Sequence, residues 1–107
     1  MNLTQKHCLP CEVGTEPFNS EKNAEYLKEA PGWKISRNQK SIGRKFKFKS
    51  FAKALDFVNK VGTEAEKEGH HPDIELGWGY VNIKSTTHSI SGLSENDFIL
   101  AAKINSL

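Results

Sequence analysis

The sequence predicts an α+β domain: a four-stranded antiparallel sheet with three helices packed on one of its faces. Two pairs of short segments are rich in alternating apolar and polar residues, which is typical of strands with one buried face. Helical segments, with apolar residues at spacings of three and four, lie before, between and after these pairs. The order helix, two strands, helix, two strands, helix therefore favours an antiparallel sheet with its helices on one face.

The first 19 residues are expected to form an irregular arm. Residues 1–19 contain Cys8, Cys11 and two prolines without a clean period, and we expect them to lie on the surface or on a partner. Residues 20–107 then make up the single domain. His7, Cys8 and Cys11 could ligate zinc together with another histidine, but one C-x2-C pair in an arm is weak evidence for a metal site. Packed or free thiols are the expected alternative.

The first helix and the first hairpin follow the arm. A helix should run from Ser20, as its N-cap, to about Ala30, because Pro31 and the glycine after it stop it. The hairpin has strands over residues 33–37 and 42–49, joined by a polar turn. The residues of these elements expected to face the core are Ala24, Leu27, Ala30, Ile42, Phe46 and Phe48.

The longest helix should begin at Ser50 as N-cap and end at Gly69. Pro72 prevents the helix from continuing, so the pair His70-His71 lies just beyond a helix end. Its apolar stripe is expected to consist of Phe51, Ala54, Leu55, Val58, Val61 and Ala65.

A second hairpin and a last helix complete the predicted fold. The strands are expected over residues 73–76 and 80–88, with a turn through 77–79, which places His88 at the end of a strand on its polar side. The last helix starts at Ser94, where Asp97 completes a capping box. Leu93 can staple against Phe98, and the expected buried side consists of Phe98, Ala101 and Ala102.

Composition excludes several classes of function. The chain has 107 residues, 36% of them hydrophobic, which suits one modest core that gains stability from self-association. The net charge of +2 gives no strong reason to expect a nucleic acid or a membrane as partner. We find no signal peptide, no apolar run long enough to span a bilayer and only two cysteines, so a cytoplasmic location without a structural disulfide is expected.

Three of the four histidines, His70, His71 and His88, lie within 19 residues of one another. Histidine titrates near neutral pH, so it can give or take a proton in catalysis. An elimination of water needs both actions, one to protonate the departing hydroxyl and one to remove a proton from the neighbouring atom. The cluster therefore indicates acid–base chemistry, although any single histidine is more often a surface or structural residue.

The supporting residues have structural explanations beside the functional ones. Asp97 is fully explained by the capping box, and one carboxylate oxygen could still serve each role. Glu66 would be an ordinary residue on a solvated helix face, and Trp78 is more often a packing residue than a stacking platform.

These residues together resemble a known family. The pattern Glu66, His70-His71-Pro72, Trp78, His88 and Asp97 is similar to the signature of the pterin-4a-carbinolamine dehydratases. The resemblance covers nearly the whole folded part, from about Ser20 to the C-terminus. The arm from Cys8 to Cys11 also resembles the N-terminal segment of some bacterial members.

The resemblance implies a hydro-lyase that dehydrates 4a-hydroxytetrahydropterin to the quinonoid dihydropterin, in the recycling of tetrahydrobiopterin and similar tetrahydropterins. It implies that His70 and His88 are the acid–base pair, that His71 and Trp78 bind the substrate, and that Glu66 and Asp97 orient imidazoles. No metal and no organic cofactor would be needed, since the pterin is the substrate. It further implies a homodimer or homotetramer and a functional link to an aromatic amino-acid hydroxylase.

Three positions depart from the animal members: Gly69 stands where Asp is usual, Ile74 where Trp is usual and Asn96 where Arg is usual. These changes affect expectations about affinity and pterin preference rather than the reaction class. A non-catalytic interaction protein is the main alternative, because some animal relatives are dimerisation cofactors of a homeodomain transcription factor through the helix that corresponds to residues 51–68. A zinc-dependent hydrolase is a third alternative, and it would lose activity with a chelator.

Overall fold

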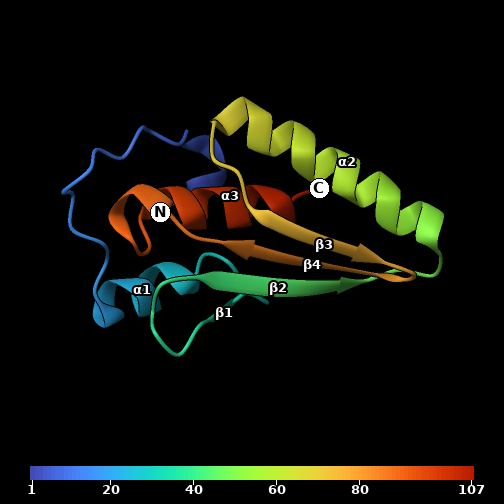
Figure 1. Ribbon diagram of the computed structural model, residues 1–107, viewed down its shortest axis with the longest axis horizontal. Helices are drawn as coiled ribbons and strands as arrows, with labels where there is room; N and C mark the ends of the chain where they lie inside the picture. The colour runs from blue at the N-terminus through green and yellow to red at the C-terminus, as the bar shows by residue number, and fades with distance from the viewer.

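The computed structural model describes residues 1–107, and it confirms the predicted α+β architecture. A four-stranded antiparallel sheet in the order β1-β2-β4-β3 is covered by three helices (Figure 1). The strands are β1 (Lys34–Ile35), β2 (Ile42–Lys47), β3 (Asp73–Gly77) and β4 (Tyr80–Ser85), and the α-helices are α1 (Ser20–Leu27), α2 (Phe51–Glu68) and α3 (Glu95–Asn105). Two short 3₁₀ helices, η1 (Leu3–Gln5) and η2 (His88–Ile90), complete the set.

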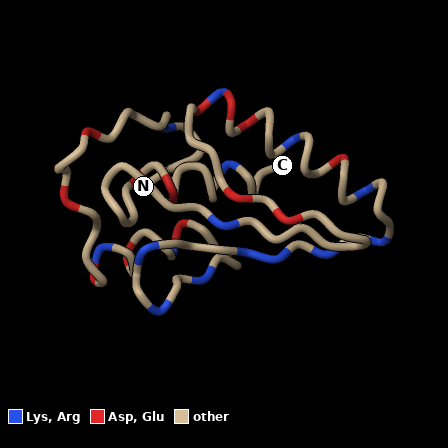
Figure 2. Tube along the Cα trace, viewed as in Figure 1, with Lys and Arg blue, Asp and Glu red and all other residues tan.

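Strand β4 is one of the two inner strands of the sheet, because it pairs with β2 on one side and β3 on the other. Its residues Val81, Ile83 and Ser85 are buried against the helices, as is typical of one face of an alternating strand. Figure 2 shows basic residues along β2 and acidic residues along β3. By their alternation with the buried positions, Lys45, Lys47, Asp73 and Glu75 lie on the opposite face, where they are exposed. One face of the sheet therefore carries the core and the other faces solvent.

Helix α2 begins and ends where the sequence predicted. The Ser50 side chain accepts a hydrogen bond from the Lys53 N–H, and Gly69 ends the helix in the left-handed conformation. The prediction that Phe51 and Leu55 are buried is wrong, because they are 45% and 40% exposed. The buried stripe is narrower than the apolar stripe and consists of Ala54, Val61, Ala65 and Glu68.

Helix α1 differs from its prediction at both ends. Asn19, rather than Ser20, is the N-cap, since its side chain accepts the hydrogen bond from the Lys22 N–H. The helix ends at Leu27 and leads into tight turns before Trp33. Its buried residues are Asn23 and Tyr26; the predicted core residue Ala24 is exposed, Leu27 is half-buried and Ala30 is buried.

Helix α3 has the predicted capping box at Ser94 and Asp97, but the helix is buried on nearly every side. Residues 96–104 are all buried, including Lys103, whereas the sequence indicated one buried side. The reason is its position: α3 contacts α1, α2 and η1 (Figure 1). A helix surrounded by other elements needs no solvated face.

The strands are shorter than predicted at several ends. The expected strand over 33–37 contains only the two residues of β1, and the expected strands over 42–49 and 80–88 end at Lys47 and Ser85. His88 is therefore not a strand residue, because a bridge between Thr87 and Gly92 turns the chain into η2. The arm is irregular apart from η1, and it inserts Leu3 into the core. No helix is long and apolar enough to cross a membrane.

Two glycines of the α2 region allow a paired test of this local structure. Gly69 has φ +63°, and an added Cβ would contact nothing, so Gly69→Ala should cost about 1 kcal/mol through backbone strain alone. Gly62 lies inside the helix, and an added Cβ would contact nothing there either, so Gly62→Ala should stabilise the fold by about 0.5–1 kcal/mol. Urea unfolding measures both values. If both variants changed the free energy of unfolding in the same direction, the result would contradict the assigned helix end.

Candidate active site

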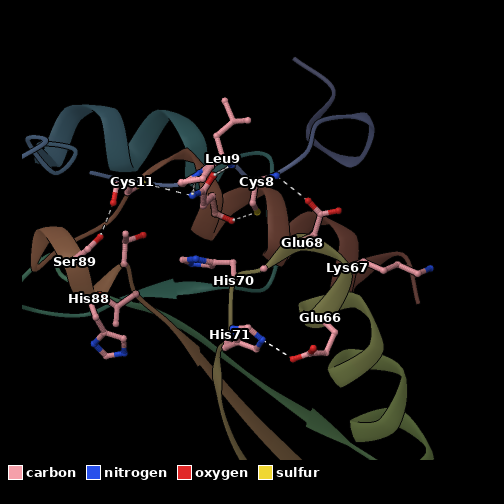
Figure 3. Close-up of a pocket in the computed structure, with 15 residues that line it drawn as sticks. Cys8, Leu9, Cys11, Glu66, Lys67, Glu68, His70, His71, His88 and Ser89 are labelled. Carbon is pink, nitrogen blue, oxygen red and sulfur yellow. Dashed lines mark hydrogen bonds and ion pairs between the residues drawn. The ribbon is translucent and has the colours of Figure 1, made fainter. Parts of the chain in front are cut away.

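A pocket opens where the end of α2, the segment after β4 and the N-terminal arm meet (Figure 3). Its volume is about 540 Å³, which is large enough for a fused two-ring heterocycle. The residues that line it are Cys8, Leu9, Pro10, Cys11, Glu66, Lys67, Glu68, Gly69, His70, His71, Thr86, Thr87, His88, Ser89 and Asn96. Most of these residues are polar, so the pocket suits a ligand rich in hydrogen-bonding groups.

The His70 side chain is held by the buried carboxylate of Asp97. The distance from His70 Nε2 to Asp97 Oδ1 is 2.7 Å, and the two side chains are 11% and 0% exposed. The same carboxylate accepts hydrogen bonds from the hydroxyls of Ser85 and Thr87 and from the Ser94 N–H. One oxygen thus serves the capping box while the other orients the histidine. A carboxylate with four donors fixes the position of the imidazole.

His71 and His88 lie nearer to solvent than His70. His71 Nε2 is 2.7 Å from Glu66 Oε1, and both side chains are largely exposed. His88 comes from η2, across the pocket from the end of α2, and its ring makes no hydrogen bond within the chain (Figure 3). The structure therefore brings Glu66, His70, His71 and His88 around one pocket, with Asp97 directly behind His70.

Trp78 does not belong to this group. It lies in the turn between β3 and β4, at the opposite end of β3 from His71, and it does not line the pocket of its own chain. Trp78 is 72% exposed, so the packing explanation does not hold within one chain either. The length of β3 separates Trp78 from His71 within one chain, and the role of Trp78 in substrate binding stays a prediction.

The site contains a buried ion pair that the sequence analysis missed. Lys103 Nζ is 2.7 Å from Glu68 Oε2, with both side chains less than 9% exposed. The arm binds to the same carboxylate, since the Cys8 N–H donates to Glu68 Oε1 at 2.8 Å and His7 Nδ1 lies 3.1 Å from Oε2. Glu68 continues the spacing of Val61 and Ala65 along the buried side of α2, which is the one signal that could have indicated its burial.

These contacts change the acidity of two groups. Burial alone raises the pKa of Glu68, but hydrogen bonds from Lys103, the Cys8 N–H and His7 outweigh it and lower the pKa to about 2. Burial, with the adjacent Glu68 carboxylate, raises the pKa of the Cys8 thiol to about 12. Cys8 is therefore a neutral thiol near pH 7 rather than a thiolate ligand.

The zinc alternative has no preformed geometry in this structure. No group of three or more His, Cys, Asp or Glu side chains is arranged to hold a metal ion. His7 bonds to Glu68 instead, while Cys8 and Cys11 are free thiols whose sulfur atoms each lie 3.5 Å from an atom of Asn96.

Comparison with known proteins identifies the family. Residues 16–107 match the family model described as pterin 4 alpha carbinolamine dehydratase. The chain belongs to this family. A protein of Halorhodospira halophila, provisionally named a pterin-4-alpha-carbinolamine dehydratase, is 48% identical over 107 residues, covering 100% of this chain and 98% of the relative. The Arabidopsis thaliana protein named pterin-4-alpha-carbinolamine dehydratase 2, mitochondrial, is 44% identical over 110 residues, covering 99% of this chain and 59% of its own.

Solved structures of dehydratase-like proteins share the fold. A Brucella melitensis protein described as a transcriptional coactivator/pterin dehydratase superposes with a TM-score of 0.80 at 32% identity, over 85% of this chain and 97% of its own. A pterin dehydratase-like protein described as a RuBisCO assembly factor has a TM-score of 0.61 at 24% identity, over 73% of this chain and 90% of its own, and supports the fold alone. The sequence resemblance to the dehydratase family is thus confirmed.

Two histidine–carboxylate pairs, each with an N–O distance of 2.7 Å, differ in burial and should differ in their effect on stability. Asp97→Asn should lower the free energy of unfolding by about 3 kcal/mol, because it places an amide donor among four buried donors. Glu66→Gln should change it by less than about 0.5 kcal/mol, since that pair is exposed to water. Urea unfolding at pH 7 gives both values, and similar losses would show that burial is not the deciding factor.

The Glu68 pair should make stability depend on pH in the acid range. Its pKa is about 2 in the folded protein and 4.5 as the ordinary value, so its contribution is present above pH 4.5 and is lost as the pH falls toward 2. Between these values the wild type should lose about 3 kcal/mol more than Glu68→Gln. Urea titrations at successive pH values measure the difference. Glu12→Gln, in the exposed part of the arm, should keep the wild-type dependence of the free energy of unfolding on pH. The same dependence for Glu68→Gln as for wild type would contradict the prediction.

Proposed function

We propose that this protein catalyses the dehydration of 4a-hydroxytetrahydropterin to quinonoid dihydropterin by histidine acid–base chemistry, without a metal. The observation that carries the proposal is His70, whose Nε2 is held by the buried Asp97 carboxylate in a polar pocket that His71 and His88 also line. Membership of the dehydratase family supports the same reaction.

The reaction requires one proton to be removed and one to be added. The C4a–O bond breaks, the proton on N5 is lost, and the electron pair of the N5–H bond forms the C4a=N5 double bond. The departing hydroxyl takes up a proton and leaves as water. Two groups that titrate near neutral pH, placed on two sides of the substrate, meet this requirement.

The hydrogen bonds of the pocket support a division of roles. A carboxylate can only accept, so His70 donates its Nε2–H to Asp97 and keeps Nδ1 without a partner in the protein. This arrangement suits His70 as the base, with its imidazolium stabilised by Asp97 after proton transfer. His88 then supplies the proton to the hydroxyl, while His71, held by Glu66, binds and orients the pterin.

An interaction role on the same fold is the second candidate function. Phe51 and Leu55 are exposed on α2, so this helix presents an apolar patch beside its charged residues. The Brucella melitensis structure carries the description of coactivator as well as dehydratase. This surface could serve a homodimer or homotetramer or a separate protein partner.

We also propose a cytoplasmic location for the protein. The free state of Cys8 and Cys11 is consistent with this location.

The test of the proposed function follows the ultraviolet absorbance of 4a-hydroxytetrahydropterin, generated in situ, as it decays with purified protein and excess EDTA. Wild type should accelerate the decay with or without the chelator. His70→Ala and His88→Ala should each lower kcat by about 10²–10⁴-fold, whereas His71→Ala should chiefly raise KM.

His7→Ala is the matched control, because His7 is 79% exposed and does not line the pocket. It should retain wild-type turnover, and circular dichroism should verify that every variant is folded. No acceleration by wild type over the spontaneous decay would reject catalysis. Acceleration that disappears with EDTA would reject the metal-free mechanism.

A further inference from the structure

The N-terminal arm forms one wall of the candidate active site. Four consecutive residues, Cys8 to Cys11, line the pocket, opposite the end of α2 and beside η2. Leu9 is 71% exposed, and its side chain points away from the pocket (Figure 3). The sulfur atoms of Cys8 and Cys11 are directed at Asn96. The side chains of three of the four residues are thus engaged elsewhere, which leaves the backbone as the main surface of this wall.

Asn96 fixes the position of the arm relative to the histidines. Its Oδ1 accepts a hydrogen bond from the Leu9 N–H at 3.0 Å, and its Nδ2 donates to the Leu9 carbonyl. Ser89 donates to the Cys11 carbonyl at 3.2 Å, and Glu68 accepts from the Cys8 N–H at 2.8 Å. Asn96 and Ser89 are sequence neighbours of Asp97 and His88, and Glu68 lies two residues before His70. The position of the arm is therefore fixed by the same elements that position the proposed acid–base residues.

Some backbone groups of this wall have no partner within the chain. The structure gives no intramolecular hydrogen bond to the N–H of Cys11 or to the carbonyls of Cys8 and Pro10. A donor and two acceptors on a short segment match the edge of a heterocycle that carries an amide beside an amino group. The pyrimidine edge of a reduced pterin has this pattern.

We propose that the arm segment Cys8–Cys11 binds the pyrimidine edge of the pterin through its backbone, with Asn96 as the positioning residue. This inference rests on the proposed function for the identity of the ligand. The segment binds substrate and transition state equally, because the bonds that change lie at C4a and N5, away from that edge. Loss of the wall should therefore raise KM and leave kcat nearly unchanged.

Leu9→Pro tests the proposal without touching the core. It removes the N–H that donates to Asn96, on a residue whose side chain is exposed. Glu16→Pro is the matched control, because Glu16 also precedes a proline in the arm, and its N–H makes no hydrogen bond within the chain. Asn96→Leu removes the side-chain amide that holds the backbone of Leu9. Hydrogen exchange at the Cys8 amide reports whether the arm is released, and Asn96→Leu serves as the test if Leu9→Pro leaves that amide protected.

Two readouts separate this inference from the proposed function. The dissociation constant for 7,8-dihydropterin and the KM for 4a-hydroxytetrahydropterin should both rise about tenfold in the variant whose arm is released, with kcat within about twofold of wild type. Glu16→Pro should have the wild-type dissociation constant and the wild-type KM. If the arm is released and the dissociation constant is unchanged, the inference is overturned. The arm would then cover the pocket without binding the ligand.

The remaining outcomes also decide between the two proposals. If wild type binds dihydropterin without accelerating the dehydration, the proposed function fails. The ratio of the dissociation constants of the released variant and wild type then still tests whether the arm binds the ligand. If wild type binds no dihydropterin, the inference is overturned. A fall in kcat alone would also overturn it, because that result would assign the arm to the chemical step rather than to binding.

Discussion

The buried carboxylate of Asp97 is the interaction on which the rest of the site depends. It accepts from the N-cap of α3, from two hydroxyls at the end of β4 and beyond it, and from the His70 ring. A buried carboxylate is costly unless all its hydrogen bonds are made, so these donors must stay together. The end of the sheet, the start of α3 and the candidate catalytic histidine are therefore fixed relative to one another by one group.

A second polar contact, between Glu68 and Lys103, extends this arrangement to the arm. The pair joins the last turn of α2 to α3, and its remaining hydrogen-bonding capacity receives the backbone of Cys8. Breaking such a pair by removing one partner leaves an unpaired buried charge, which is costly, so the pair constrains how α2 and α3 pack. Leu3 in the core and Phe18, whose N–H bonds to the Leu93 carbonyl, hold the arm before and after the segment that lines the pocket.

Local signals predicted the elements well where a single residue type decides the backbone. Ser50, Gly69 and the Ser94–Asp97 box lie at the expected helix ends, because caps depend on near neighbours in the sequence. The exposure of Phe51 and Leu55 and the burial of Lys103 were not predictable in this way. They depend on which elements pack around a helix, and periodicity alone does not report that.

The amino-acid sequence determined the strand alternation, the helix boundaries at strong caps, the histidine cluster and the family, since each depends on residue type and spacing along the chain. Tertiary structure decided that Asp97 meets His70, that Glu66 meets His71 rather than His70, and that Trp78 does not line the pocket. It also brought an irregular arm onto the site through Asn96 and Glu68. Such pairings join residues up to 88 positions apart, and their geometry follows from how the sheet and helices pack rather than from any local pattern.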